Sequence, residues 1–273
     1  MPPGGTGILL ATKPMTQAGP GAGRVDIGLK TWHTAAVRGS VLVVQNDQDK
    51  SLGGIADALV RAGVRLDVRS PNRDLPAVRG YAGLIVLPGL ADPVDEDAAV
   101  VRAREAIYGA LLAELPILGL CLGGQLLVQA LGGSVSRCEP ELGFADVFAS
   151  SAAGTDPLMG GVPEQFSVFH AHAFAFEPPP DAEILLKNDV CVQACRHGQS
   201  WAFQCHPEVS REWVARLAAA LRGKDSGLSA ATTDFFARNR VSPEQLERDA
   251  RSANPTLREI VRGIGTGFAA LIA

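Results

Sequence analysis

The 273-residue chain lacks the features that mark membrane proteins, nucleic-acid-binding proteins and secreted disulfide-rich proteins. No apolar run approaches the ~20 residues that a membrane-spanning helix needs. The formal net charge is −4 and no basic cluster exceeds a few residues, so we expect no nucleic-acid or membrane-surface partner. The five cysteines are odd in number and lack framework spacing, which predicts a reducing compartment and a cytoplasmic location.

Two further absences narrow the possible functions. Residues 1–40 are rich in Gly, Pro and Ala but lack the charged and compact apolar regions of a signal peptide, so we expect a flexible N-terminal extension. No Gly-x-x-x-x-Gly-Lys phosphate loop occurs in the sequence, so nothing indicates a nucleotide-binding domain of that type.

The body of the chain alternates between apolar runs of strand length and segments with helical periodicity. Continuous apolar strands between helices predict a parallel sheet covered on both faces. Strands then dominate residues 135–203, which predicts a mixed extension of the sheet with hairpins. The expected strands and helices of the first half cover residues 41–45, 55–62, 64–69, 83–87, 98–115 and 117–120.

A cysteine stands where the strand over residues 117–120 gives way to a helix-like segment, in Gly119-Leu-Cys121-Leu-Gly-Gly-Gln125. A Cys between small residues at such a turn has the setting of a nucleophile elbow, which pushes the side chain out of the backbone. The following helix N-terminus favours a thiolate, the reactive form of the side chain. We therefore expect Cys121 to be a nucleophile.

A second stretch supplies the partners that such a nucleophile needs. His206-Pro-Glu208 follows another strand-like run, and alternate residues of an extended segment share one side. A histidine can take the thiol proton and later protonate the leaving group, and a carboxylate can orient that histidine. The expected catalytic set is therefore Cys121, His206 and Glu208.

Together these motifs resemble the class I glutamine amidotransferase family, whose pattern is Gly-x-Cys-x-Gly-x-Gln followed by His-Pro-Glu. The resemblance implies a flavodoxin-like α/β fold with a central, mostly parallel sheet, over a catalytic domain at residues 41–222. Residues 223–273 then form a C-terminal helical extension. Further segments that carry the resemblance are Glu141-Leu-Gly-Phe144, Phe169-His-Ala-His172 and Gln193-Ala-Cys-Arg196.

The resemblance also implies a mechanism without a metal or cofactor, through a γ-glutamyl thioester on Cys121. The backbone N–H groups of Gly89 and Leu122 are the expected oxyanion donors. The family usually has Gly-Gly where this chain has Pro88-Gly89, so one potential N–H donor is missing. The residues that the resemblance places around the substrate are Gln125, Glu141, Leu142, Gly143 and His172.

The expected substrate is glutamine or another γ-glutamyl amide. Residues 209–273 are too few for a synthetase domain, so two enzymatic readings stay open. One is a glutaminase of the GMP-synthase type that passes ammonia to a separate synthetase subunit. The other is a stand-alone γ-glutamyl peptidase with the same chemistry, and a non-catalytic binding protein on this scaffold is the third alternative.

Two other groups of side chains are not expected to bind metal. His170 and His172 would share one face of a strand, but the sequence shows no third ligand near them, so we interpret them as pocket-wall or buried polar residues. Cys191 and Cys195 also share a face but have no second pair, so we interpret both as core residues.

The C-terminal region carries two helix signals. Ser242-Pro243 predicts one start, because Ser suits the cap and Pro suits the first turn, and Asn254-Pro255 predicts another. The second segment then carries an apolar stripe that is expected to dock on the catalytic domain, or otherwise to form a homodimer or partner interface. The stripe consists of Leu257, Ile260, Val261, Ile264, Phe268 and Leu271.

Overall fold

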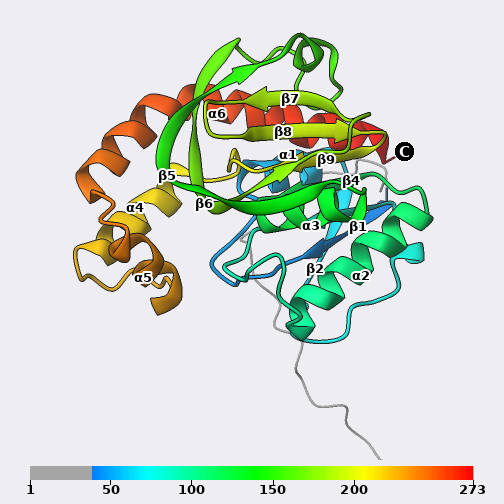
Figure 1. Cartoon of the computed structure of the whole chain (residues 1–273), viewed down its shortest axis with the longest axis horizontal. Coiled ribbons are helices and arrows are strands. Elements are labelled where there is room, and N and C mark those ends of the chain that lie inside the picture. Colours follow the sequence, from blue (N-terminus) through cyan, green and yellow to red (C-terminus); the bar gives the residue numbers. More distant parts are fainter. Residues whose placement is uncertain (1–38, 273) are drawn as a thin grey trace, which may run out of the picture. The chain divides into compact units, whose positions relative to one another are not determined.

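The computed structural model describes residues 39–272 (Figure 1). The prediction of a flexible N-terminal extension therefore falls almost wholly outside the described residues. Within them, no helix is both long enough and apolar enough to span a bilayer.

Parallel strands form the first half of the sheet. Four of them are short and apolar, as expected for strands covered on both faces, while β2 alternates apolar and charged residues and is half-buried. Their order, β2-β1-β3-β4-β9, is that of a flavodoxin-like sheet and confirms the predicted fold class. The strands are β1 (Gly39–Val44), β2 (Val64–Arg69), β3 (Gly83–Val86), β4 (Ile117–Leu120) and β9 (Ser200–Phe203).

Antiparallel strands continue the sheet beyond β9, in the order β8-β7-β5-β6, to give nine strands. The long hairpin of β5 and β6 sets Glu141 opposite His172 and Gly143 opposite His170, and the register shifts between Arg137 and Glu141. This half confirms the predicted mixed extension. Its strands are β5 (Ser134–Ala149), β6 (Gln165–Glu177), β7 (Glu183–Lys187) and β8 (Val192–His197).

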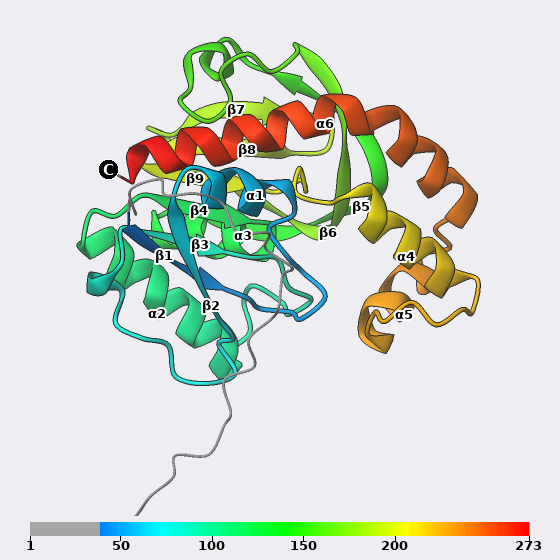
Figure 2. The ribbon, with the colours of Figure 1, turned by 180° about the vertical axis from the view of Figure 1, so that it is seen from behind.

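Helices cover both faces of the parallel half. The helices α2 (Ala98–Leu112) and α3 (Leu122–Ala130) bury apolar side chains on one face. On the other face lie α1 (Gly54–Arg61) and the 29-residue α6 (Pro243–Leu271), which Figure 2 shows running side by side. Each face of the parallel half therefore has its own apolar cluster. The edge formed by the carboxyl ends of the parallel strands lies between the two clusters.

A third apolar cluster lies beyond the sheet. There α4 (Arg211–Leu221), α5 (Ala230–Arg238) and the first turns of α6 pack against Phe169 of β6. Short 3₁₀ turns occur at Val78–Gly80 and Ser151–Thr155.

The C-terminal apolar stripe docks on the rest of the chain. Ile264 and Phe268 are fully buried in the cluster that also holds Ile55 and Leu59 of α1. Gly265 permits the close approach, because a Cβ there would lie 2.5 Å from that of Ala58. The expectation that the stripe docks within the chain is confirmed.

The prediction of a separate helix starting at Asn254-Pro255 is wrong. Pro255 lies inside α6, which continues from Pro243 to Leu271. A proline within a helix removes one backbone hydrogen bond and costs roughly 3 kcal/mol. The buried stripe passes through this point unbroken, from Leu246, Ala250 and Ala253 to Leu257 and Ile260, and its burial outweighs that cost.

Candidate active site

Cys121 lies at the turn between β4 and α3. Its φ of 47° is in the left-handed region, which a non-glycine residue rarely adopts, and it caps the N-terminus of α3. The backbone N–H of Cys121 donates to the carbonyl of Phe203 on β9, at 2.7 Å. The sequence therefore builds a strained elbow that is held in place by two neighbouring strands.

The glycines around Cys121 allow α3 to sit directly on the strands. A Cβ on Gly123 would lie 2.1 Å from the carbonyl oxygen of Val86, and one on Gly119 would lie 2.5 Å from that of Gly123. Backbone atoms cannot move aside as flexible side chains do. The spacing Gly-x-Cys-x-Gly is therefore required by packing at this turn.

His206 and Glu208 lie just beyond the end of β9. His206 Nδ1 is 2.8 Å from Oε1 of Glu208, and the two residues are 2% and 5% exposed. The backbone N–H of His206 donates to the carbonyl of Phe169 at 2.8 Å, which fixes the imidazole beside β6. The structure thus brings together the histidine and carboxylate that the sequence paired.

Electrostatic interactions favour a protonated His206. Burial alone would lower its pKa, but the carboxylate of Glu208 and the thiol of Cys121 outweigh burial and raise the pKa to about 9. Cys121 itself is 5% exposed. The three predicted catalytic residues therefore interact with one another in a nearly dry site, where charges act strongly.

Two glutamines brace the elbow from behind. The Gln125 side-chain amide donates to Oε1 of Gln204 at 3.1 Å and to the carbonyl of Phe174 at 3.2 Å. Gln204 in turn donates from Nε2 toward Sγ of Cys121 at 3.7 Å. Gln125 therefore supports the turn that carries Cys121, because its side-chain N–H groups already donate to other protein groups.

Gly89 and Leu122, the expected oxyanion donors, are neighbours. A Cβ on Gly89 would lie 2.8 Å from a side-chain methyl group of Leu122 and 2.9 Å from Asn46. Asn46 donates from Nδ2 to the carbonyl of Leu87 at 2.6 Å, which holds the loop between β3 and Gly89. The loop that lacks one N–H at Pro88 therefore lies against the turn that carries Cys121.

Lys50 is a charged residue of this site that sequence reasoning missed. It is 8% exposed, and its Nζ lies 4.6 Å from the ring centroid of Trp213. Burial lowers its pKa, while Asp47, Cys121 and Glu208 oppose that effect by attraction. The sequence feature that could have identified Lys50 is its position in the loop after β1, because this loop lies at the same edge of the sheet as the ends of β3 and β4.

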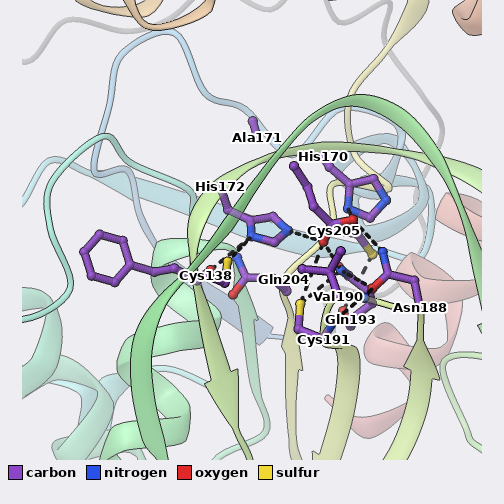
Figure 3. Close-up of polar contacts among 12 residues, drawn as sticks. Cys138, His170, Ala171, His172, Asn188, Val190, Cys191, Gln193, Gln204 and Cys205 are labelled. Carbon is purple, nitrogen blue, oxygen red and sulfur yellow. Dashed lines mark hydrogen bonds and ion pairs between the residues drawn. The ribbon is translucent and has the colours of Figure 1, made fainter. Parts of the chain in front are cut away.

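A second buried cluster lies on β5 and β6, beside the elbow. His172 Nε2 is 3.1 Å from Oε2 of Glu141, and His170 Nδ1 is 3.9 Å from Oε1. Figure 3 shows the two rings on the same side of their strand, with Ala171 directed away from them. The carbonyl of Ala171 lies 4.0 Å from Sγ of Cys121, so the cluster adjoins the candidate active site.

This cluster corrects the expectation that no third ligand lies near the two histidines. In an antiparallel hairpin, residues directly opposite each other share a face, and Glu141 is opposite His172. The pKa of His170 is lowered to about 4, chiefly by burial and against the pull of Glu141. Burial would raise the pKa of Glu141, but the close contact with His172 and the charges of both histidines outweigh burial and lower it.

The remaining predicted residues are dispersed. Leu142 and Gly143 line a groove against the start of α6, together with Ser242 and Gln245. They do not share the buried cluster of Glu141 and His172. The five residues assigned to the substrate by resemblance therefore lie in three places along β5, β6 and α3.

The other cysteines occupy settings unlike that of Cys121. Cys205 is fully buried, and burial raises the pKa of its thiol well above the usual range. Cys195 lies in the apolar core, as expected. The expectation for Cys191 was wrong, because this residue precedes β8 and its Sγ lies 3.8 Å from Oε2 of Glu141 in the polar cluster.

Residues 43–213 match the family model of glutamine amidotransferase class-I. The chain belongs to this family. The matched range covers more than half of the chain. It includes the end of β1, the elbow, the β5–β6 hairpin and the segment that carries His206 and Glu208.

Among curated proteins, the chain is similar to one subunit of the glutamine-hydrolysing GMP synthase. It is 39% identical over 115 residues to that of Methanococcus maripaludis and 36% identical over 116 residues to that of Methanocaldococcus jannaschii. Each match covers 41% of this chain and 60% of the relative. The similarity thus spans less than two thirds of these relatives' length.

Solved structures show the same fold. A glutamine amidotransferase of Thermotoga maritima superposes with a TM-score of 0.73 at 22% identity, covering 84% of this chain and 97% of that one. A glutamine amidotransferase of Methylobacillus flagellatus gives 0.72 at 23% identity, covering 85% and 94%. The architecture therefore extends beyond the segment of highest sequence similarity.

Proposed function

We propose that this chain is a glutaminase that hydrolyses the γ-amide of glutamine and supplies ammonia to a separate synthetase subunit. The observation that carries the proposal is the geometry of the site, in which Cys121 lies at a strained elbow at the start of α3 and His206 Nδ1 lies 2.8 Å from Oε1 of Glu208. Family membership and the names of the similar GMP synthase subunits support it.

In the first half-reaction, Sγ of Cys121 attacks the γ-carbonyl carbon. The C–N bond then breaks, and the nitrogen leaves as ammonia with the proton that His206 held. The product on the protein is a γ-glutamyl thioester. Glu208 keeps the imidazole oriented and stabilises its positive charge until that proton is transferred.

In the second half-reaction, water attacks the thioester carbonyl and His206 accepts its proton. Glutamate leaves and the sulfur is restored. The tetrahedral intermediates of both steps carry an oxyanion, for which the N–H groups of Gly89 and Leu122 are the proposed donors. Pro88 has no N–H to add, so a partner subunit that repositions Gly89 would raise the rate.

The same proposal includes the residues that form the wall of the substrate site. By resemblance, Glu141, Leu142, Gly143 and His172 border the bound amino acid. Because the carboxylate of Glu141 and the ring of His172 are engaged with each other in the interior, they shape this wall from behind Ala171. The deep burial of Cys121 favours ammonia over a bulky leaving amine, and so favours glutaminase over γ-glutamyl peptidase.

The test is glutamate release from glutamine and from a panel of γ-glutamyl amides, with the purified chain and no ATP. We expect slow hydrolysis of glutamine that rises when a synthetase subunit is added. Rapid release from a bulky γ-glutamyl amide, with glutamine poor, would instead identify the peptidase. No release from any substrate, with or without a partner, rejects both enzymatic functions.

A further inference from the structure

The cluster of Glu141, His170 and His172 has the composition of a metal site. One ligand-type atom from each residue lies within 4.8 Å of the others. His170 and His172 are 0% and 4% exposed and Glu141 is 9% exposed, so water cannot easily satisfy these polar groups. What satisfies them must therefore be found inside the protein.

Hydrogen bonding fixes which nitrogen of His172 is free. Its Nδ1 lies 3.0 Å from the carbonyl oxygen of Phe174, which can only accept, so the proton is on Nδ1. The lone pair of Nε2 then points toward Oε2 of Glu141, 3.1 Å away, in a contact that is not aligned as a hydrogen bond. Two acceptors that face each other at this distance need either a proton or a metal ion between them.

His170 is without a hydrogen bond at either ring nitrogen. Its Nδ1 is directed to the other oxygen of Glu141, but 3.9 Å is too long for a hydrogen bond. A hydrogen-bond contribution from the backbone of Ala145 is the weakest of the influences on the pKa of His170, and its geometry does not meet that of a hydrogen bond. A fully buried imidazole with neither nitrogen paired is rare in native proteins.

A single proton on Nε2 of His172 would relieve its contact with Glu141 but would leave His170 unpaired. One metal ion would satisfy all three groups together. Ligand atoms that surround Zn²⁺ tetrahedrally are about 3.3–3.6 Å apart. Nε2 of His172 lies 3.1 Å from Oε2 of Glu141, and Nδ1 of His170 lies 3.9 Å from the other oxygen, Oε1, so the two separations lie on either side of that range.

We infer that Glu141, His170 and His172 bind one divalent transition-metal ion, with Zn²⁺ the best match. Two imidazoles and one carboxylate are a donor set that suits Zn²⁺ and excludes Mg²⁺ and Ca²⁺, which prefer oxygen ligands. The geometry leaves a fourth position for water or for a thiol. Metal binding at this cluster can be measured whether or not the chain hydrolyses glutamine, so the two proposals can fail separately.

Neighbouring side chains already donate hydrogen bonds to the carboxylate of Glu141, as the groups around the ligands of a metal site do. Asn188 donates from Nδ2 to Oε1 of Glu141 at 2.5 Å, and Gln193 donates from Nε2 to Oε2 at 2.7 Å. Figure 3 shows Asn188, Cys191 and Gln193 approaching from the side opposite His172. A bound ion would therefore tie the β5–β6 hairpin to the β7–β8 turn, directly behind Ala171.

The experiment measures metal content. The full chain is stripped with a chelator, incubated with Zn²⁺, desalted and measured by mass spectrometry of the metal. We expect one equivalent per chain, lost in Glu141→Gln and in His170→Ala combined with His172→Ala. His197→Ala is the matched control and should keep the ion, because this histidine is part-exposed and pairs with Asp181 on the surface.

A second measurement uses the unmutated chain, so that a folding failure of the variants does not decide the matter. Zn²⁺ should slow amide hydrogen exchange in β5 and β6 selectively, and bound Co²⁺ should show the strong visible absorption of a tetrahedral site. Three outcomes overturn the inference: no retained ion, retention in the double-histidine variant, or loss of the ion only when Cys138 and Cys191 are both replaced by Ser.

Discussion

His206 Nδ1 and Glu208 Oε1 lie 2.8 Å apart, in the first loop after β9, and both side chains are almost fully buried. A carboxylate at this distance inside a protein holds the imidazole in one orientation and favours its protonated form. Because Cys121 also acts on His206, the sulfur and the protonated imidazole form an interacting pair at the elbow. Each group of that pair can be tested separately.

The nucleophile is the first test. Cys121→Ala should lower kcat for glutamate release by about 10⁴-fold or more, as expected for a residue that acts as part of a catalytic unit. Cys205→Ser is the matched control, because Cys205 adjoins His206 but is fully buried in the apolar core. It should keep most of the activity. The opposite pattern would assign the chemistry to the wrong thiol.

The base is the second test. His206→Asn should lower kcat/KM by roughly 10²–10⁴-fold, the usual loss for a general base, or more within a triad. Glu208→Gln should cost less, because it removes orientation and charge but leaves the proton carrier. His197→Ala should change nothing, since this surface histidine contacts only Asp181 among the ion pairs of the described residues. A loss in His172→Ala as large as that in His206→Asn would contradict this assignment.

The pH dependence follows from the raised pKa of His206. Its pKa is about 9 in the folded chain and 6.5 in the unfolded one, so the folded state binds the proton more tightly. The resulting stability is complete below about pH 6.5 and is lost as pH rises through about 9. The rate of glutamine hydrolysis should fall over the same alkaline pH range, because the leaving nitrogen needs the proton of His206.

Glu208→Gln supplies the control for this profile. Without the carboxylate, burial dominates and the pKa of His206 falls, so the alkaline limb of kcat/KM should move to lower pH. An alkaline limb that stays in place in this variant would mean that another group sets it.

Lys50 should support the thiolate. Its charge is held near Cys121 and Glu208 in a buried position, and the attraction between Lys50 and the thiolate is mutual. Lys50→Met should therefore lower the rate of iodoacetamide labelling at Cys121 several-fold at neutral pH. The exposed Lys224→Met is the control. Equal labelling rates in the two variants would show that Lys50 does not act on the thiol.

The elbow itself makes a stability prediction. Gly123→Ala places a Cβ 2.1 Å from the carbonyl oxygen of Val86, and the backbone must shift. We expect about 1–3 kcal/mol of destabilisation, or more if the turn cannot relax. Gly154→Ala is the matched control, because nothing lies within 4 Å of its added Cβ. Denaturant unfolding of both variants measures the difference.

Local sequence signals were sufficient for most of the fold and for the elements of the elbow. β1, β3, β4 and β9 are short apolar runs and β2 alternates, and the place of these strands between helices predicts a parallel sheet without further information. Cys121 and the pair His206 and Glu208 were recognisable because each motif is contiguous. The order of strands then brings their ends to one edge of the sheet.

The features that sequence reasoning missed depend on distant contacts. Glu141 joins His170 and His172 only through the register of β5 with β6, which shifts near Arg137 and is not written in either strand. Lys50 becomes buried through Trp213, which lies far along the chain in α4. Pro255 stays helical because the apolar stripe on both sides of it is buried against the sheet.

The sharpest test of Cys121 as the nucleophile is labelling with a glutamine-like chloroketone, followed by peptide mass spectrometry and the glutamate-release assay on the same sample. We predict a single adduct on Cys121, protection by glutamine, and loss of hydrolysis in proportion to labelling. An adduct confined to another cysteine, or full hydrolysis in a sample whose Cys121 is completely modified, would contradict this assignment.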